Sequence, residues 1–517
     1  MIVVMGVMAA SSLFVAAAFA AANGDLPLTR DSQDRKQAYA AAEAGINLYQ
    51  YHLNQDPDYW NRCTNVPAPN ATENQPVNQA WNGTSPTLDP RRWRNVAGRN
   101  TQYTLELLPA PGKATCVAGD LASMVDPATG TFRIRSTGRP RQGSKLKRSI
   151  IASFRRKSFL DFLYFTDFET TDPINYTATY QSWANTNCGS GRYRPQRATS
   201  GGPDGDGCIE IQFADADAIT GPFHTNDSIL TCGKPDFGRL GKADSIEFTP
   251  TVNPWIQLGG TCAAGPPNFR TTPRTGVTKL TMPTTNASLE ALAAADGKLY
   301  TGRTTIRFNA ATNNMTVTNP TLGSNKTESL PNNGVIYVKS GVGGCGTIRP
   351  PSDADYSEST SCGTVSVSGT YAKSMTLAAA NDIIIRPPTG TDNGDIIGSG
   401  DAVLGLIATN FVRVYHPCSG TTMPDVRIDA AILSLLHSFT VDNYDCGSKL
   451  GNLTVKGAIA QKYRGAVGTG GASSGGSGYI KDYQYDDRLQ YRSPPYFLDP
   501  IAASWHVIRS NEQVPAR

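Results

Sequence analysis

The apolar stretch near the start of the sequence constrains the fold more than any other feature. Residues Ile2–Ala22 contain no charged residue and no proline. A helix of these 21 residues rises about 1.5 Å per residue, so it is about 30 Å long and matches the hydrocarbon thickness of a bilayer. The stretch therefore predicts a single membrane-spanning helix, with the bulk of the chain outside the cytoplasm.

The alternative reading of this stretch is a cleaved signal peptide. Ala18, Phe19 and Ala20 form the A-x-A pattern of a cleavage site. No basic residue precedes the apolar run, and this favours a retained anchor over a signal peptide.

A second, amphipathic helix is predicted from Asp31 to Asn54, after a short break in the apolar run. Small side chains recur in it at Ala38, Ala41 and Gly45, at the i, i+3, i+7 spacing of one helical face. A face of this kind lets another backbone approach closely.

The ten cysteines predict structural disulfides, and thus an oxidising compartment. Their number is even, none forms a C-x-x-C pair, and the chain has only five histidines, so clustered zinc ligands are not expected. We therefore expect no metal site and no cofactor. The candidate disulfide cysteines are Cys63, Cys116, Cys188, Cys208, Cys232, Cys262, Cys345, Cys362, Cys418 and Cys446.

From about Asp172 onward, short apolar runs alternate with glycine, asparagine and aspartate. Four runs have centres at Ile384, Leu406, Ile428 and Leu453, which gives steps of 22, 22 and 25 residues. Such a step is one turn of a parallel β-solenoid, in which each coil stacks its apolar residues on the previous coil. A β-sandwich produces a similar alternation of short apolar runs and turn residues, and it remains the alternative. Neighbours in the sequence of a solenoid are neighbours in space, so the expected cysteine pairs are 63–116, 188–208, 232–262, 345–362 and 418–446.

These features predict an α+β and mainly β chain of four regions. They are the N-terminal helices at residues 1–60, an α+β region at residues 61–157, the β-solenoid at residues 158–467, and a Gly/Ser loop with an aromatic tail at residues 468–517. The tail is expected to cap the end of the solenoid, because an uncovered terminal coil invites edge-to-edge growth.

The order of these segments resembles the type IV pilin-like proteins, in particular the PilX-like minor pilins. The resemblance is carried by Ile2–Ala22 followed by Arg35–Ile46, and by a long helix that precedes a small antiparallel sheet. It implies a structural subunit of a pilus or related filament on the cell surface, whose partners are other pilin subunits and the pilus assembly machinery. In such subunits the apolar helix first lies in the membrane and then packs among its copies in the filament core. The residues expected to serve this packing are Ala16, Ala17, Ala20, Ala38, Ala41 and Gly45.

The size of the head predicts a minor position in the filament. Roughly 450 residues follow the two helices, too many to repeat at every position of a thin filament. A role at the filament tip or in its initiation complex tolerates one bulky head, whose β-rich region could present an adhesive surface.

Two groups of mainly acidic residues are catalytic candidates, because glycan hydrolases and lyases use close carboxylates. We interpret both groups as surface or turn residues and expect that the protein is not an enzyme. The alternatives are a cell-surface, polysaccharide-active β-solenoid enzyme and a free-standing adhesin. The first group is Asp215, Asp217, His224 and Asp227, and the second is Asp482, Asp486 and Asp487.

The stretch Arg133–Lys157 holds ten basic residues and no acidic one. It could contact phosphates of nucleic acid or of anionic lipids. The net charge of +4 over 517 residues gives no general affinity for nucleic acid. We favour a solvated hairpin face, so nucleic acid is not an expected partner.

Overall fold

The structure, a computed structural model, describes most of the chain beyond residue 29. The described residues are 30–56, 59–62, 93–114, 116–117, 120, 123–126, 129–189, 191, 197–215, 217–258, 262, 265–346, 350–351, 354, 356–387, 393–419, 422–470, 475–501 and 505–516. They are mainly β, which confirms the coarse prediction of fold class. The chain divides into two compact units: unit 1 comprises residues 1–126, 131–156 and 504–517, and unit 2 comprises residues 127–130 and 157–503.

The predicted membrane span Ile2–Ala22, with Ala16, Ala17 and Ala20, lies outside the described residues. Of the helices that the structure does describe, none has the length and apolar character needed to cross a membrane.

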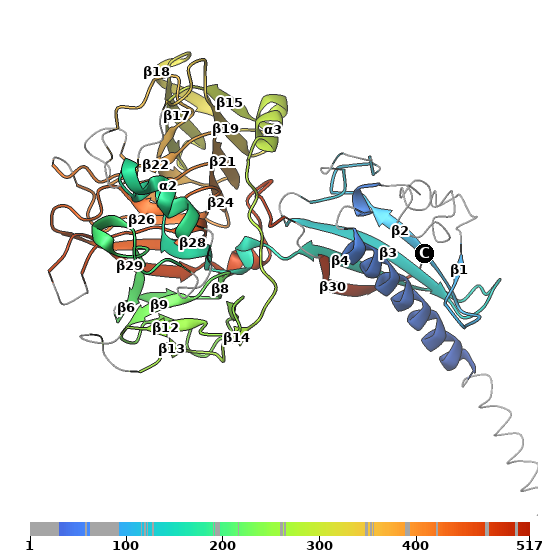
Figure 1. The fold of residues 1–517 in the computed structure, drawn as a ribbon. Helices are drawn as coiled ribbons and strands as arrows, with labels where there is room; N and C mark the ends of the chain where they lie inside the picture. Colours follow the sequence, from blue (N-terminus) through green and yellow to red (C-terminus); the bar gives the residue numbers. More distant parts are fainter. Residues whose placement is uncertain are drawn as a thin grey trace, which may run out of the picture. The chain divides into compact units, whose positions relative to one another are not determined.

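Unit 1 consists of a helix packed on an antiparallel sheet of five strands (Figure 1). The helix covers residues 30–55 and precedes the 3-10 turn η1 (Tyr59–Arg62). The strands lie in the order β1 (Arg94–Asn95), β2 (Gln102–Leu108), β3 (Thr131–Arg139), β4 (Arg148–Arg156) and β30 (Trp505–Gln513).

Aromatic rings fill the layer between this helix and sheet. Phe132 on β3 and Phe154 on β4 are paired across the strands, and their rings stack with centroids 5.2 Å apart. Tyr49 of the helix contacts both rings, while Trp60 and Trp505 pack on Phe132. All five side chains are buried. Each buried ring removes roughly 150–250 Å² from water, so this cluster dominates the core of unit 1.

The C-terminal tail does not form the end cap that the sequence predicts at residues 468–517. β30 pairs antiparallel with β4 and completes the sheet of unit 1. Before it, Leu489 and Phe497 pack on the side of unit 2, in one apolar cluster with Leu433 and Ala458 of successive strands. The tail thus contributes first to an apolar cluster of unit 2 and then to the sheet of unit 1.

Unit 2 is built from parallel strand ladders (Figure 1). The longest ladder runs through β15 (Lys298–Thr301), β19 (Val335–Lys339), β21 (Met375–Ala379), β24 (Leu404–Ala408), β26 (Arg427–Ser434), β28 (Lys449–Arg464), β5 (Tyr164–Thr171), β8 (Phe223–Thr225), β11 (Ile246–Phe248) and β14 (Arg274–Thr275). A second runs through β20 (Val365–Tyr371), β23 (Ile396–Gly398), β26, β28, β29 (Gly478–Tyr485), β7 (Ala218–Thr220), β10 (Asp236–Phe237) and β13 (Asn268–Phe269). A third runs through β16 (Thr304–Asn309), β20, β22 (Ile383–Ile385), β25 (Val412–Val414) and β27 (Phe439–Val441).

Smaller elements complete unit 2. β17 (Asn314–Asn319) and β18 (Gly323–Ser329) extend β16 as an antiparallel hairpin. β6 (Gln212–Ala214), β9 (Ile229–Cys232) and β12 (Trp255–Gln257) form a separate parallel sheet. The helical elements are η4 (Phe159–Asp161), η5 (Pro173–Asn175), α2 (Ala178–Asn187), η7 (Pro203–Gly205), α3 (Ser288–Asp296) and η9 (Asp487–Gln490).

Side chains stacked from strand to strand form the core of unit 2. Leu377, Leu406, Ile432 and Ile459 pair in register along the longest ladder, and Tyr164 of β5 follows Ile459. All five are buried in one cluster. The ladder therefore places β5, from early in the chain, beside β28, from late in the chain.

A crossing segment makes this order possible. After β14 the chain returns to β15, at the other end of the longest ladder, through residues 276–297. Two buried asparagines fasten this segment: the Asn226 side chain bonds the main chain of Leu280 at 2.6 and 3.0 Å, and Asn286 donates to the Ala379 carbonyl at 2.8 Å.

Candidate functional site

A cleft of about 980 Å³ opens in unit 2 beside the sheet β6-β9-β12. Its lining combines the segment around β6, the connection between β28 and β29, and the start of β29. This volume lies at the upper end of the range of small-molecule sites, about 300–1,000 Å³. The lining includes Glu210, Gln212, Asp215, Asp217, Tyr444 and Lys481.

An ion pair between Asp217 and Lys481 belongs to the cleft wall. The Lys481 ammonium donates to both carboxylate oxygens of Asp217, at 2.9 and 3.0 Å. Asp217 also accepts the main-chain N–H of Ala214 at 3.0 Å. Burial lowers the pKa of Lys481, although Asp217 acts in the opposite direction. The two side chains therefore neutralise each other within the protein.

Asp215 differs from Asp217 in its surroundings. It is exposed at the cleft, and its Oδ1 accepts the main-chain N–H of Lys234. The chain thus brings two of the four residues of the first sequence cluster, Asp215 and Asp217, to one cleft.

Asp227, the third member of that cluster, is not among the lining residues and binds Arg197. The buried Arg197 guanidinium donates to Asp227 at 2.6 Å and to both oxygens of Glu210, at 2.6 and 2.8 Å. Two carboxylates thus share one cation. Burial raises the pKa of Asp227 to about 7, against the opposing effect of Arg197.

This pKa predicts a pH dependence of stability. The folded pKa of Asp227 lies above the ordinary value of 3.8, so the folded state binds this proton more tightly. Between about pH 4 and 7 the group therefore adds stability as the pH falls, and this contribution is lost as the pH rises through 7. At about 1.4 kcal/mol per pH unit, it changes the free energy of unfolding by roughly 2–3 kcal/mol between pH 5 and pH 8. The Asp227→Asn variant should lack this share of the pH slope of the unfolding free energy, which urea unfolding at pH 5 and pH 8 measures.

A matched control is Asp236→Asn, which removes a carboxylate paired with Arg270 at the surface. Its slope should equal that of the wild type. Equal slopes for the wild type and Asp227→Asn would contradict the prediction.

His224, the fourth member, is buried away from the cleft lining. Its Nδ1 lies 2.9 Å from Glu247, its Nε2 lies 3.3 Å from Asn226, and its ring packs on Phe162 and Phe165. Burial lowers the pKa of His224, while Glu247 acts in the opposite direction. This histidine anchors β8 within unit 2 rather than facing a ligand.

The second sequence cluster does not converge on one site. Asp482 accepts from the Thr454 hydroxyl at 3.0 Å. Asp486 pairs with Arg488 at 2.6 Å, and Asp487 pairs with Arg239 at 2.8 Å. Each carboxylate thus has a separate partner.

Among the described residues, four disulfides join cysteines that are adjacent in the sequence order. They are Cys188–Cys208, Cys232–Cys262, Cys345–Cys362 and Cys418–Cys446, the pairs expected from the sequence. Cys63, half of the fifth expected pair, lies outside the described residues.

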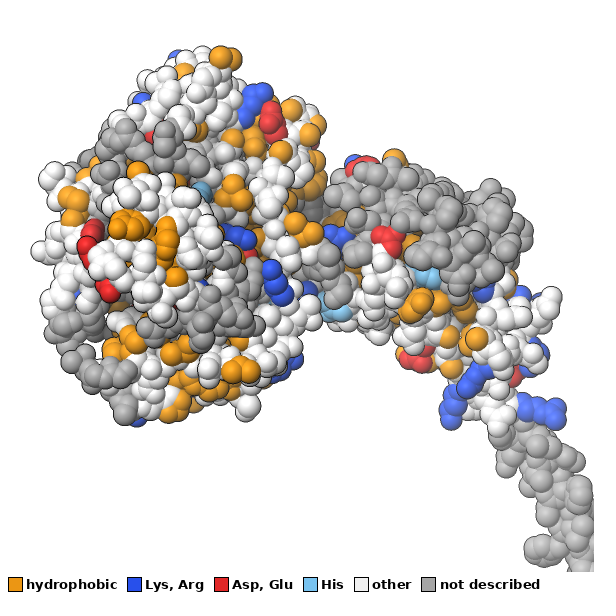
Figure 2. Space-filling model, viewed as in Figure 1, with side chains coloured by type: hydrophobic (Ala, Val, Ile, Leu, Met, Phe, Trp, Pro, Cys, Tyr) orange, Lys and Arg blue, Asp and Glu red, His pale blue; other side chains and the backbone are white. Residues whose placement is uncertain are grey.

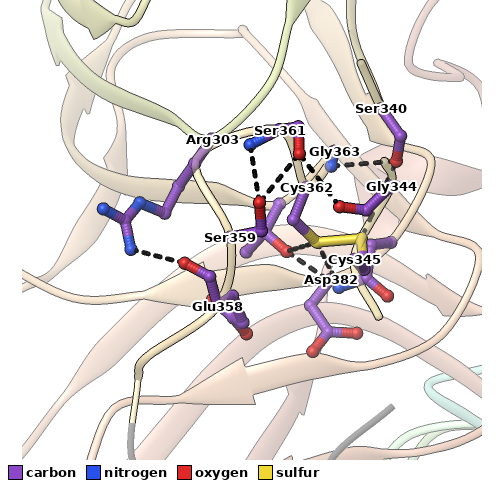
Figure 3. Close-up of a disulfide and its surroundings, with 12 residues drawn as sticks. Arg303, Ser340, Gly344, Cys345, Glu358, Ser359, Ser361, Cys362, Gly363 and Asp382 are labelled. Atoms are coloured by element: carbon purple, nitrogen blue, oxygen red, sulfur yellow. Dashed lines mark hydrogen bonds between the residues drawn. A yellow bond between two sulfur atoms is a disulfide. The ribbon is translucent and has the colours of Figure 1, made fainter. Parts of the chain in front are cut away.

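Figure 3 shows how the Cys345–Cys362 disulfide fastens the segment between β19 and β20. Cys362 is buried and accepts the Asn381 amide at 3.2 Å. Nearby, Ser361 donates to the Gly344 carbonyl at 3.2 Å, and Arg303 donates to the Glu358 carbonyl at 3.0 Å. The disulfide therefore helps to hold Glu358 over the ladders.

Opening this disulfide should destabilise unit 2. The bridge joins cysteines 17 residues apart, and closing a loop of that size contributes about 3 kcal/mol in the chain-entropy model. A Cys345→Ser, Cys362→Ser double variant should lose about this much unfolding free energy in urea titration. A loss below about 1 kcal/mol would show that the segment is held by its hydrogen bonds alone.

The fastened segment covers a buried cation, Arg413. Its guanidinium lies within 3.4 Å of carboxylate oxygens of Glu358, Asp382 and Asp442. Tyr356 donates to Asp442 at 2.7 Å. Burial raises the pKa of Asp442 to about 6 and also raises the pKa of Asp382, while Arg413 opposes both changes.

The sequence predicts that Ala38, Ala41 and Gly45 pack between subunits, but in the structure they face the sheet of unit 1. Ala38 and Ala41 are buried within unit 1. A side chain at Gly45 would overlap with Ser136 and Tyr103 of the sheet. This face lets the helix approach its own sheet, so it is not open to a second helix. Ala16, Ala17 and Ala20 lie outside the described residues.

Some of the basic residues in the stretch Arg133–Lys157 are paired with carboxylates. Arg135 pairs with the buried Glu106 at 2.8 Å, Arg148 pairs with Glu512, and Lys157 pairs with Glu247 at 2.9 Å. On the face of unit 2 shown in Figure 2, basic and acidic side chains lie in small groups among other residues. The sequence predicts a solvated hairpin face, and the buried Arg135 and Arg155 show that this face is solvated only in part.

Sequence reasoning missed the cations that organise the cleft. Arg197 and Arg464 are buried, and Arg464 bonds the carbonyls of Ile211 and Gln212 while its guanidinium stacks 3.4 Å from the ring centre of Phe213. Arg464 lies more than 250 residues from its partners in the sequence, and Arg197 lies 30 residues from Asp227, so no local pattern identifies these ion pairs.

No group of three or more metal-ligating side chains is found among the described residues.

Comparison with known proteins adds little to the geometry. No protein-family model matches the sequence, and no curated protein sequence matches it. Among solved structures, the competence-associated pilin ComZ from Thermus thermophilus aligns over 93% of this chain and 97% of its own, at 12% sequence identity and a TM-score of 0.27. A TM-score of that size carries no argument about this chain, whose fold rests on its own strand pairings.

Proposed function

We propose that this chain is a pilin-like structural subunit that is assembled into a type IV pilus or related filament, or primes its assembly. The observation that carries the proposal is in unit 1. The helix of residues 30–55 follows the apolar stretch Ile2–Ala22 in the sequence, and its small-residue face packs on an antiparallel sheet. A long helix laid on a small sheet is the plan of a pilin head, which the sequence resemblance implies.

The apolar stretch anchors the subunit in a membrane before assembly. Residues 30–37 at the start of the described helix are largely exposed. Charged side chains there, including Arg30, Asp31 and Arg35, suit a position at the membrane surface. The bulk of the chain lies outside the cytoplasm, and the four disulfides support an oxidising compartment.

The subunit occupies a minor position, at the filament tip or in the initiation complex, as PilX-like proteins do. Unit 2 covers residues 157–503, a bulk that cannot easily repeat along a thin filament. We interpret its parallel ladders as the coils of a β-solenoid, interrupted in chain order between β28 and β5.

The proposal includes that the protein is not an enzyme. In the cleft, Asp217 is neutralised by Lys481 and Glu210 by Arg197, which leaves Asp215 as the remaining carboxylate among the lining residues. Carboxylates committed to such pairs are poorly placed to exchange protons with a substrate.

The test is deletion of the gene with complementation in the source cells. Loss of filament number, or a change in filament composition, restored by the full-length chain is the expected result. Unchanged filaments, together with failure of the chain to co-purify with pilins, would sink the proposal.

A second variant separates packing from anchoring. Replacing Ala16, Ala17 and Ala20 with leucine should reduce incorporation into filaments, because larger side chains keep helices apart. The same variant should still be found in the membrane fraction, since leucine favours insertion. Normal incorporation would count against helix packing as the mechanism.

A further inference from the structure

We infer that the cleft of unit 2 is a binding site for a neutral oligosaccharide. This goes beyond the proposed function, since it concerns unit 2 alone and requires no filament. The cavity measures about 980 Å³, which gives room for several sugar rings at the scale of small-molecule sites.

Disulfides and buried arginines hold the walls of the cleft in place. Cys232, in the lining, is bonded to Cys262, and Cys188–Cys208 fastens the segment that leads to Glu210. Arg464 bonds the carbonyls of Ile211 and Gln212, which also line the cleft. A cleft fixed in this way is formed before a ligand arrives, so binding costs little ordering of the protein.

The charges of the cleft favour a ligand without net charge. Glu210 is paired with Arg197 and Asp217 with Lys481. The lining also holds one further carboxylate, Asp215, and one further ammonium, Lys449, so its charges remain balanced. An anionic ligand would compete with Asp217 for Lys481. A cationic ligand would compete with Lys481 for Asp217, or with Arg197 for Glu210. Breaking such a partly buried pair leaves one charge without its partner, which is costly.

The remaining groups suit a ligand rich in hydroxyls. Gln212 is exposed in the lining and offers both donors and an acceptor, and Asp215 retains acceptor capacity beyond its one main-chain bond. The lining also contains the half-buried Tyr444, whose ring combines an apolar face with a polar end. A sugar presents hydroxyls at its edges and C–H groups on its faces, so a neutral glycan matches this combination.

The test is a glycan array probed with the purified full-length chain. The array carries neutral hexose, pentose and N-acetylhexosamine oligosaccharides, together with uronic-acid and glucosamine oligomers as anionic and cationic arms. We expect binding of at least one neutral class, confirmed by calorimetry with that oligosaccharide in solution. Absence of any neutral binder, or preference for a charged arm, would overturn the inference.

Two glutamine variants locate the site. Gln212→Trp should fill the cleft and weaken binding at least about tenfold, a change of about 1.4 kcal/mol. Gln484→Trp is the matched control, because Gln484 is also exposed on a strand of unit 2 but is not among the lining residues. Circular dichroism should show both variants folded. Equal affinity of the two variants would place the binding elsewhere and overturn the inference.

Discussion

Replacing Arg413 with methionine is expected to lower the free energy of unfolding of unit 2 by about 3–5 kcal/mol. Its guanidinium is 2% exposed and is the cation for Glu358, Asp382 and Asp442. Methionine restores much of the volume but leaves these carboxylates without a counter-charge. Hydrogen exchange in peptides from β22, β25 and β27, followed with urea, measures the loss where it should occur.

Arg427→Met is the matched control for this change. Arg427 also pairs with an aspartate, Asp429, but its side chain is 46% exposed, so water screens the pair and its loss should cost about 0–1 kcal/mol. Equal costs for the two variants would contradict the view that Arg413 holds the covering segment. A smaller cost for Arg413→Met at pH 5 than at pH 8 is also expected, because the buried carboxylates can then take up protons.

Replacing Gly138 with valine should separate the helix from the sheet of unit 1. A side-chain carbon at Gly138 would overlap with the main-chain oxygen of Ala38 and the main-chain nitrogen of Ala42. Backbone atoms cannot move aside as a flexible side chain does, so we expect at least the upper end of the usual overpacking cost of about 1–3 kcal/mol. Tryptophan fluorescence should report the loss, since Trp60 and Trp505 lie in this core.

Arg133→Val, on the same strand, provides the comparison. Arg133 is exposed, so its replacement should change the unfolding free energy by less than about 0.5 kcal/mol. If Gly138→Val proved equally mild, the close contact between helix and β3 would be wrong.

The sequence was most informative where local pattern and packing agree. The spacing of Ala38, Ala41 and Gly45 identified the helix and its contact face, yet it did not say what the face contacts. A small-residue face suits a neighbouring helix and a close-lying sheet equally well. Gly138 of the sheet lies against this helix. It is 93 positions from Gly45 in the sequence, and only the fold brings these segments together.

The strand pairing of unit 2 shows a second limit of prediction from the sequence. Steps of 22, 22 and 25 residues predict that Ile384 stacks near Leu406, but Ile384 pairs with Arg413 in another ladder. Leu406 pairs instead with Leu377 and Ile432, which lie 29 and 26 residues away. Each coil contains several strands and loops of variable length, so equally apolar runs can belong to different ladders.

The cysteine pairs could be predicted from the sequence and the cleft could not, because their residues differ in how far apart they lie along the chain. Cys345 and Cys362 are close in sequence, and the chain needs only one turn to bring them together. Lys481 and Asp217 are 264 residues apart, and they meet because β29 pairs with β7 across the break in chain order.

The central claim, that this chain works as a pilin-like subunit, is tested most directly by purifying filaments from cells that carry an epitope-tagged chain. Immunogold labelling and quantitative mass spectrometry should place the chain at filament ends, at far fewer copies than the main pilin. Filaments that lack the chain entirely, with the tagged protein free at the cell surface, would contradict the account and favour a free-standing adhesin.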